Sequence, residues 1–243
     1  MKAVILAAGY ATRLYPLTLD KPKALLPVSG KPIMNYIIEK LEKINEIDEI
    51  FIISNDKFYM NFVWWLNQNT FNKKVEVMND GTLSNETRLG GIGDLWFVAE
   101  NKKIDDDVLV ISGDNLFDFN IQEMIDFFKK LNKTTVGVYD INDLEEVKKM
   151  SVIEIKDGKI VSFEEKPKNP QTALSSIGIY IFTKEDLKKI EEYMKTDKNK
   201  DGPGYLVQDF CKNSEVYSFI FKGRWFDIGS KETYDKVNNI WRE

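Results

Sequence analysis

The most constraining feature of this sequence is a short apolar run near the N-terminus that stops at a glycine. Ala3–Ala8 reads AVILAA, and Gly9 follows it directly. An unbroken apolar run of this length predicts a strand that is buried on both faces of a sheet. In an open α/β sheet, ligands bind in the loops that follow the carboxyl ends of such strands. The sequence therefore predicts a ligand-binding loop immediately after this strand.

The segment after Gly9 carries positive charge. Arg13, Lys21 and Lys23 lie within eleven residues, and a single carboxylate, Asp20, stands among them. Three prolines stiffen the same segment, because each fixes one backbone torsion. A glycine turn with fixed cations suits a nucleoside triphosphate, whose charge must be neutralised as pyrophosphate leaves. Neither a Walker phosphate loop nor a complete dinucleotide fingerprint is present.

The composition narrows the chemistry further. The chain has 243 residues, a net charge of −5 and no histidine. Without histidine there is no Ser-His or Cys-His triad, and a bound metal must be held by oxygen, which points to Mg²⁺ or Mn²⁺. The acidic balance disfavours binding to a nucleic acid polymer. Cys211 is the only cysteine, which favours a reducing compartment, and we interpret it as a core thiol rather than as a nucleophile.

The N-terminus does not resemble a secretory signal. Only Lys2 precedes the apolar run, which is about six residues long. No stretch of the sequence approaches the roughly 20 apolar residues that a membrane-spanning helix needs. We therefore expect a cytoplasmic protein that does not contact a membrane.

Predicted strands and helices alternate through the first half of the chain. Strands are expected at Ala3–Ala8, Glu49–Ser54, Val75–Met78, Asp107–Ser112 and Thr134–Tyr139. Helices are expected at Pro32–Ile44, Lys57–Gln68, Leu95–Asn101 and Phe119–Leu131, with a loop over Asn79–Leu95. This alternation predicts an α/β protein with a Rossmann-like, mixed but mainly parallel sheet between helices.

The second half of the chain has a different pattern. Val152–Ile155 and Ile160–Glu164 alternate around Asp157-Gly158, which predicts a β-hairpin. Further strands are expected at Ile177–Thr183 and Val216–Phe221, and helices at Lys184–Lys195, Tyr205–Lys212 and Lys231–Trp241. We expect a single domain over residues 1–243. It would consist of a nucleotide-binding core (1–147), a small antiparallel acceptor-binding lobe (148–221) and a return to the core (222–243).

Three further motifs carry charge at predicted strand ends. Gly113-Asp114-Asn115 follows a buried strand, where a carboxylate is well placed to hold a metal over the sheet. Glu165-Lys166-Pro167 follows the hairpin, and Asp227 lies in the motif Trp225–Ser230, just before a helix. Taken singly, each has a simpler explanation as a turn, an exposed charge cluster or a carboxylate near a helix N-cap.

Taken together and in order, the four motifs resemble those of the sugar-1-phosphate nucleotidylyltransferases. The opening signature of that family, G-x-G-T-R-L-x-P-L-T-x-x-x-P-K-x-L-x-P-V, is matched from Gly9 to Val28 at nearly every defined position. The G-D-N, E-K-P and W-x-D-x-G-[ST] motifs of the family are matched by the three motifs above, and Gly90–Leu95 resembles its base-binding segment. The resemblance covers essentially the whole chain.

The resemblance implies a reaction between a nucleoside triphosphate and a sugar 1-phosphate, with glucose 1-phosphate and dTTP or UTP as the first choice. It implies catalytic roles for Arg13, Lys23, Asp114, Lys166 and Asp227, with Mg²⁺ or Mn²⁺ held by Asp114 and Asp227. It implies nucleotide contacts for Ala8, Gly9, Tyr10, Ala11, Thr12, Arg13, Gly90, Gly91 and Asp114. It implies contacts to the sugar phosphate for Glu165, Lys166, Gly178 and Asn115. A homo-oligomer is compatible with the family.

Some positions depart from the family pattern. Ala11 stands where the family usually has glycine, and Asn79–Arg88 replaces the usual Gln-Pro approach to the base. The sequence ends soon after the last motif, so we expect no acyltransferase extension.

Two alternatives therefore remain open at this stage. One is a cytidylyltransferase for phosphocholine, which would need an aromatic cage drawn from Trp64, Trp65, Trp96, Tyr180 and Trp225. The other is a catalytically silent paralogue that senses nucleotide sugars and regulates a partner enzyme.

Overall fold

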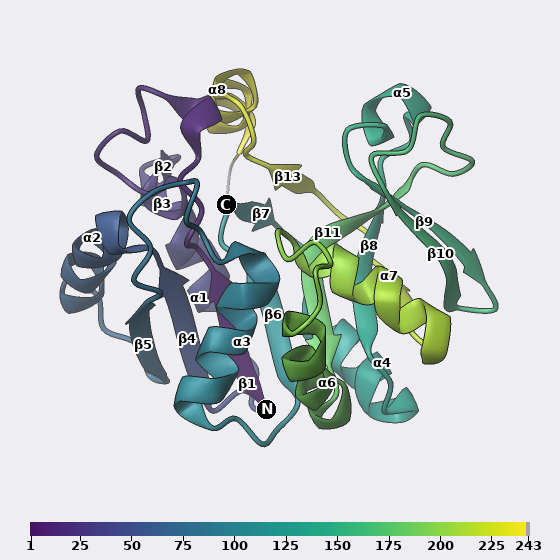
Figure 1. The fold of residues 1–243 in the computed structure, drawn as a ribbon. Helices are drawn as coiled ribbons and strands as arrows, with labels where there is room; N and C mark the ends of the chain where they lie inside the picture. The colour runs from purple at the N-terminus through teal and green to yellow at the C-terminus, as the bar shows by residue number, and fades with distance from the viewer. Residues whose placement is uncertain (242–243) are drawn as a thin grey trace.

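The computed structural model describes residues 1–241, and a mixed sheet of nine strands runs through them in the order β5-β4-β1-β6-β11-β8-β12-β10-β9 (Figure 1). The parallel part contains β5 (Lys74–Asn79), β4 (Glu49–Ser54), β1 (Lys2–Leu6) and β6 (Val108–Ser112). The mixed part contains β11 (Leu174–Phe182), β8 (Thr135–Asp140), β12 (Tyr217–Ile220), β10 (Lys159–Glu165) and β9 (Ser151–Lys156). The predicted α/β class with a mixed sheet is confirmed.

Two short ribbons stand beside the main sheet. They pair β2 (Pro27–Val28) with β3 (Lys31–Pro32), and β7 (Asn115–Phe117) with β13 (Trp225–Asp227). Two 3₁₀ turns, η1 (Thr12–Leu14) and η2 (Lys23–Leu25), form in the segment after β1.

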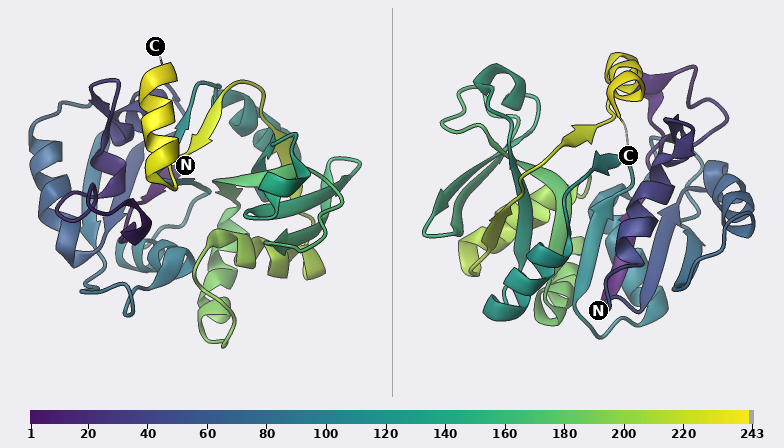
Figure 2. Two further views of the ribbon diagram at one scale, coloured as in Figure 1. Left: turned by 90° about the horizontal axis from the view of Figure 1, so that it is seen from above. Right: turned by 180° about the vertical axis from the view of Figure 1, so that it is seen from behind.

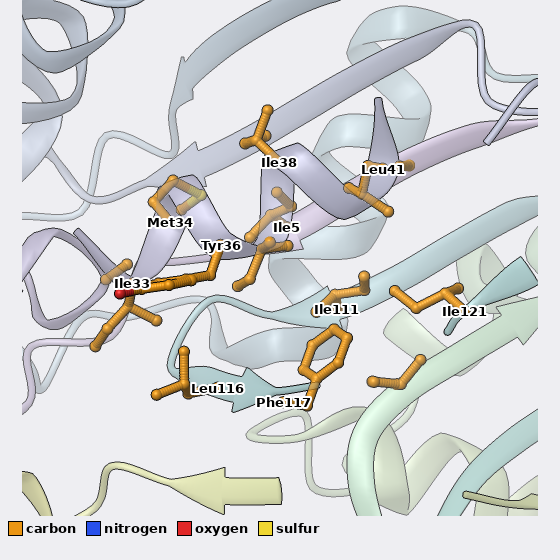
Figure 3. Close-up of a cluster of buried hydrophobic side chains, with 14 of the residues drawn as sticks. Ile5, Ile33, Met34, Tyr36, Ile38, Leu41, Ile111, Leu116, Phe117 and Ile121 are labelled. Carbon is orange, nitrogen blue, oxygen red and sulfur yellow. The ribbon is translucent and has the colours of Figure 1, made fainter. Parts of the chain in front are cut away.

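Helices cover both faces of the sheet. They are α1 (Ile33–Leu41), α2 (Asp56–Asn67), α3 (Gly90–Lys102), α4 (Gln122–Leu131), α5 (Leu144–Val147), α6 (Lys184–Met194), α7 (Pro203–Asn213) and α8 (Lys231–Ile240). Helices α1, α2 and α4 pack into one buried cluster and α3, α6 and α7 into the other. In β1, Ile5 belongs to the first cluster and Val4 to the second, so the strand is buried on both faces as predicted. Figure 3 shows part of the first cluster, between α1 and β7.

The C-terminal helix returns to the segment that follows β1. Figure 2 shows α8 beside the loops of that segment, and the Tyr234 hydroxyl donates a hydrogen bond of 2.6 Å to the carbonyl of Pro27. The pairing of β13 with β7 then places Asp227 opposite Asn115. Residues more than one hundred positions apart therefore meet at the carboxyl edge of the sheet.

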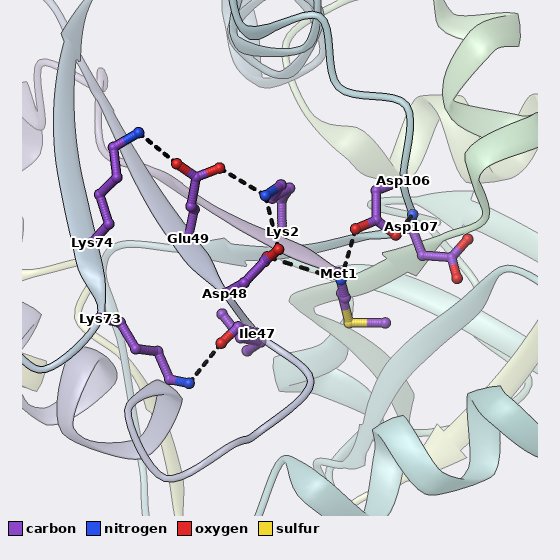
Figure 4. A network of polar contacts seen from close by, with 9 residues as sticks. All are labelled: Met1, Lys2, Ile47, Asp48, Glu49, Lys73, Lys74, Asp106 and Asp107. Atoms are coloured by element: carbon purple, nitrogen blue, oxygen red, sulfur yellow. Dashed lines mark hydrogen bonds and ion pairs between the residues drawn. The ribbon is translucent and has the colours of Figure 1, made fainter.

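The amino edge of the sheet is held by ion pairs, far from that meeting point (Figure 4). The N-terminal ammonium lies 2.7 Å from Asp106, and Lys2 lies 2.9 Å from Asp48 and 2.7 Å from Glu49. Hydrogen bonds from Lys2 and Lys74 lower the pKa of the Glu49 carboxyl. These contacts fix the start of β1 against β4.

The predicted hairpin is confirmed. Asp157 and Gly158 have φ angles of 52° and 78°, the left-handed pair that a two-residue turn between twisted strands requires. The hairpin forms the edge of the nine-stranded sheet opposite β5. In Figure 1 the hairpin lies at the right, with its turn pointing down and α5 above its other end. The division of the chain at residues 147 and 221 stays a prediction.

The largest difference between the predicted and the observed elements lies at the start of α3. This helix begins at Gly90 and not at Leu95, so its first turn contains the glycine-rich stretch that predicted a loop. The reason is a tertiary contact: the amides of Gly91 and Ile92 donate to the carbonyls of Asp201 and Lys200. These bonds satisfy helix N-terminal groups that a local sequence window cannot assign.

Smaller differences affect other boundaries. Helix α4 begins at Gln122 and not at Phe119, α7 begins at Pro203 and not at Tyr205, and β7 was not predicted. Burial raises the pKa of the Cys211 thiol to about 11, which agrees with an unreactive thiol. Among the described residues, no helix is both long and apolar enough to cross a membrane.

Candidate functional site

A cavity of about 600 Å³ opens at the carboxyl edge of the parallel strands. Eleven of the predicted site residues line it: Ala8, Gly9, Tyr10, Ala11, Thr12, Arg13, Lys23, Gly90, Gly91, Asp114 and Asp227. They come from the loops after β1 and β6, the first turn of α3, η2 and β13. The structure thus brings three of the four sequence motifs, together with the Gly90 segment, to one site.

The loop after β1 turns sharply at Ala11. This residue has φ 47° and ψ 42°, a left-handed conformation that glycine adopts more readily than alanine. The hydroxyl of Thr18 donates to the Ala11 carbonyl at 2.8 Å and holds the turn. The turn leads directly into η1, which carries Arg13 on the cavity wall.

Lys23 lies between two carboxylates that the fold brings together. Its Nζ is 2.7 Å from Asp114 and 3.7 Å from Asp227. Burial acts to lower the pKa of the Lys23 ammonium, but the two carboxylates outweigh it and the pKa is raised. Burial, and then repulsion from Asp114, raise the pKa of Asp227. A single ammonium therefore lies between two carboxylates. The three groups together keep a net negative charge, which attracts cations.

The chemistry of this carboxylate pair fits a small divalent cation. Both side chains offer hard oxygen donors: Asp227 ends β13, and Asp114 directly precedes the paired strand β7. The pKa of Asp227 is raised by burial first and by repulsion from Asp114 second. Mg²⁺ is usually held by one or two carboxylates and completes its shell with water and substrate phosphates. Within residues 1–241, no group of three or more acidic or thiol side chains gathers as an alternative cation site.

The predicted acceptor residues lie outside the lining of the cavity. Asn115 is buried, where its Nδ2 donates to the carbonyl of Ile177 and its Oδ1 accepts from Trp225. Gly178 has φ 70°, and a Cβ there would collide with Ser112. Glu165 lies near Asp201 of the cavity wall, and burial raises the pKa of its carboxyl. The roles of these residues, and of Lys166 beside Glu165, stay predictions.

Two buried acids in this region were not predicted as site residues. Asp94 in α3 lines the cavity, and Asp80 follows β5 beside it. Burial, and then the neighbouring Asp80, raise the pKa of Asp94 to about 8. Asp94 stands four residues after Gly90, a spacing that would have pointed to the site if this stretch had been predicted as a helix and not as a loop. Asn85, Arg88, Ser112 and Asp201 also line the cavity and were not predicted.

The aromatic residues considered for a choline cage do not gather. Trp64 is 66% exposed on α2, whereas Trp65 and Tyr180 are buried, and none of the five candidates lines the cavity. Trp225 contacts Tyr139 with its ring tilted by 43°, and no ring contact joins any two of the five within residues 1–241. The described part of the chain therefore offers no aromatic cage at this site.

Gly90 is the glycine that the cavity wall most strictly requires. Its φ angle is 78°, and a Cβ would lie within 2.3 Å of the Lys200 carbonyl oxygen. We expect Gly90→Ala to lower the free energy of unfolding by about 2 kcal/mol, measured by urea denaturation. Gly202→Ala is the matched control, since nothing lies within 4 Å of the added carbon. Equal stability of the two variants would contradict a close approach of the Lys200 carbonyl to Gly90.

Comparisons with known proteins agree with this geometry. The nucleotidyl transferase family model matches residues 2–243. A provisionally named mannose-1-phosphate guanyltransferase of Sulfolobus acidocaldarius is 34% identical over 98% of the chain and 62% of its own length. The bifunctional protein GlmU of Methanocaldococcus jannaschii is 29% identical over 98% of the chain and 55% of its own length. The chain thus spans little more than half the length of these relatives.

Solved structures share the fold. A provisionally named glucose-1-phosphate thymidylyltransferase from Bacillus anthracis superposes with a TM-score of 0.84 at 26% identity, covering 99% of this chain and 94% of the other. A UDP-glucose pyrophosphorylase bound to UDP-glucose gives a TM-score of 0.80 at 23% identity, covering 98% and 97% of the two chains. At 23% identity, the similarity to the UDP-glucose pyrophosphorylase shows a shared fold only.

Proposed function

This chain belongs to the nucleotidyl transferase family, and we propose that it converts a nucleoside triphosphate and a sugar 1-phosphate into a nucleotide sugar and pyrophosphate. The observation that carries the proposal is the position of Lys23 between Asp114 and Asp227, in one cavity with Arg13. Cations and carboxylates at a carboxyl edge suit the transfer of a phosphorylated group, where catalysis consists of positioning and charge stabilisation.

The proposed reaction needs no protein nucleophile. An oxygen of the sugar phosphate attacks the α-phosphorus, a new P–O bond forms, and the bond between the α- and β-phosphates breaks to release pyrophosphate. The attacking phosphate is already ionised, so no general base is required. Lys23 would stabilise charge near the α-phosphate and Arg13 charge on the departing pyrophosphate. Lys166 and Glu165 would hold the phosphate and the sugar of the acceptor.

Asp114 and Asp227 are the residues that would hold Mg²⁺, or Mn²⁺ in its place. Such an ion would supply charge neutralisation at the α-phosphate. The two carboxylates would orient that charge, and Lys23 would limit their mutual repulsion when no cation is bound.

The first-choice substrates are glucose 1-phosphate with dTTP or UTP. The name of the Bacillus anthracis structure supports this choice. The name of the Sulfolobus relative supports mannose 1-phosphate with GTP as the main alternative. The missing aromatic cage counts against phosphocholine. The convergence of Arg13, Lys23, Asp114 and Asp227 counts against a silent paralogue. The cytoplasmic location and the homo-oligomer stay predictions.

The test is pyrophosphate release from a grid of five nucleoside triphosphates against several sugar 1-phosphates and phosphocholine, with Mg²⁺ and with EDTA. We expect a metal-dependent signal for sugar 1-phosphates, strongest for glucose 1-phosphate. A signal with phosphocholine alone would identify phosphocholine, and not a sugar 1-phosphate, as the acceptor. Folded protein that is silent across the grid but is stabilised by a nucleotide sugar in thermal shifts would favour the regulatory alternative.

A further inference from the structure

Asp94 is a buried acid that the proposed mechanism does not use. Only 6% of its surface is exposed, and its side chain lines the cavity from the second turn of α3. Its Oδ1 is enclosed and receives no hydrogen bond from any described donor of the chain. A buried carboxyl with unused hydrogen-bonding capacity is costly.

The partner of Asp94 is a second acid. Asp80 is buried beside it, the two carboxyl groups are hydrogen-bond neighbours, and Asp80 also keeps one enclosed oxygen, Oδ2, without a donor. Two ionised carboxylates cannot donate to each other, so this contact requires one shared proton. The raised pKa of Asp94, about 8, agrees with its holding that proton at neutral pH. With one oxygen holding the shared proton against Asp80, the other oxygen of Asp94 is left as an acceptor for a group bound in the cavity that this residue lines.

This acid pair lies at the opposite end of the site from the phosphate-binding charges. Asp80 follows β5 and Asp114 follows β6, with β4 and β1 between them in the sheet. Three strand spacings of about 4.8 Å place the two strand ends roughly 14 Å apart. The loop after β1 spans this interval, and its Tyr10 hydroxyl donates to the Thr82 carbonyl at 2.9 Å. A nucleotide with its phosphates at Lys23 would therefore direct its base toward Asp94.

Resting on the proposed function, we propose that Asp94 reads the base, accepting a hydrogen bond from a protonated ring nitrogen and so selecting oxo bases over amino bases. Thymine and uracil carry such an N–H at N3, and guanine carries one at N1. Cytosine N3 and adenine N1 carry a lone pair instead, which an acceptor oxygen repels. The residue thus selects dTTP, UTP or GTP and rejects CTP and ATP.

The shared proton makes the test specific. In Asp94→Asn, the amide N–H₂ can donate to Asp80 in place of the shared proton, while the amide oxygen still faces the cavity. In Asp94→Leu, a side chain of similar size removes the acceptor. We expect Asp94→Asn to keep the preference for UTP over CTP within about threefold and Asp94→Leu to lower it by roughly 10- to 100-fold. The readout is kcat/KM for each nucleotide with the best sugar 1-phosphate.

A substrate analogue tests the same contact without a mutation. Wild-type protein should use N3-methyl-UTP roughly 10- to 100-fold less well than UTP, and Asp94→Leu should lose most of that difference. Asp186→Asn is the matched control, since Asp186 is a buried aspartate on α6 outside the cavity that accepts from the Thr134 hydroxyl. It should retain the discrimination of the wild type.

The outcomes separate this inference from the proposed function. Turnover that is best with CTP or ATP, or full discrimination in Asp94→Leu, would overturn the role of Asp94 while leaving nucleotidyl transfer intact. Absence of turnover with every nucleotide and acceptor would overturn the proposed function. In that case the ranking of UTP over CTP is measured as nucleotide-induced shifts in Tm, and equal shifts would overturn the base-reading role as well.

Discussion

Asp114→Asn should lower the turnover of nucleotidyl transfer by at least about 10²-fold. Asparagine keeps the shape of the side chain but removes one of the two negative charges that face each other across Lys23. A cavity with one carboxylate binds a divalent cation more weakly, and Lys23 would pair with Asp227 alone. The measurement is steady-state pyrophosphate release over a range of Mg²⁺ concentrations, together with the Kd for Mn²⁺ in the absence of substrate. We expect a higher Kd and only partial recovery of turnover at high Mg²⁺.

The control for this variant is Asp209→Asn. Asp209, on α7, is also a half-buried aspartate with a lysine partner, since it lies 2.6 Å from Lys198, and it does not line the cavity. Its loss should leave turnover and Mn²⁺ affinity within about twofold of the wild type. If Asp114→Asn behaved like this control, the carboxylate pair would not be the cation site, and the proposed mechanism would lose its central element.

Much of this site follows from local sequence patterns. The apolar run of β1 and the glycine after it predicted both the strand and the loop, because burial on two faces needs apolar residues at every position. The motif around Asp114 was placed correctly at a strand end for the same reason. The pairing of Asp227 with this strand end was suggested by family resemblance alone. It depends on a ribbon between residues more than one hundred positions apart.

The unpredicted parts depend on contacts that no local window contains. Gly90 reads as a loop residue, since glycine disfavours helices, but the carbonyls of Lys200 and Asp201 cap the helix that starts there. Asp94 reads as one more polar residue of that loop. Only the true start of α3 places it on the buried side of a helix, facing Asp80 and the cavity. Charge and glycine content were visible in the sequence, but the register of the helix was not.

Asp94→Asn should make the protein increasingly more stable than the wild type as the pH rises from about 4 to about 8. The pKa of Asp94 is about 8 in the folded state and near 3.8 when the chain is unfolded. Between these values the unfolded state releases the proton and the folded state keeps it, so wild-type stability falls as pH rises, by up to about 1.4 kcal/mol per pH unit. Asparagine removes this contribution. Urea unfolding at pH 5 and pH 8 should show the difference between variant and wild type growing by on the order of 2 kcal/mol or more.

A second variant tests the sign of this argument. Hydrogen bonds from Lys2 and Lys74 lower the pKa of Glu49, so its charge stabilises the fold above the unfolded pKa and that stability is lost on acidification. Glu49→Gln should therefore be less stable than the wild type near neutral pH, and the gap should close as the pH falls through 4. The two variants are expected to diverge from the wild type in opposite directions as pH rises. A constant difference for Asp94→Asn across this range would mean that Asp80 and Asp94 share no proton, and the neutral acceptor assigned to the base-binding end of the cavity would be wrong.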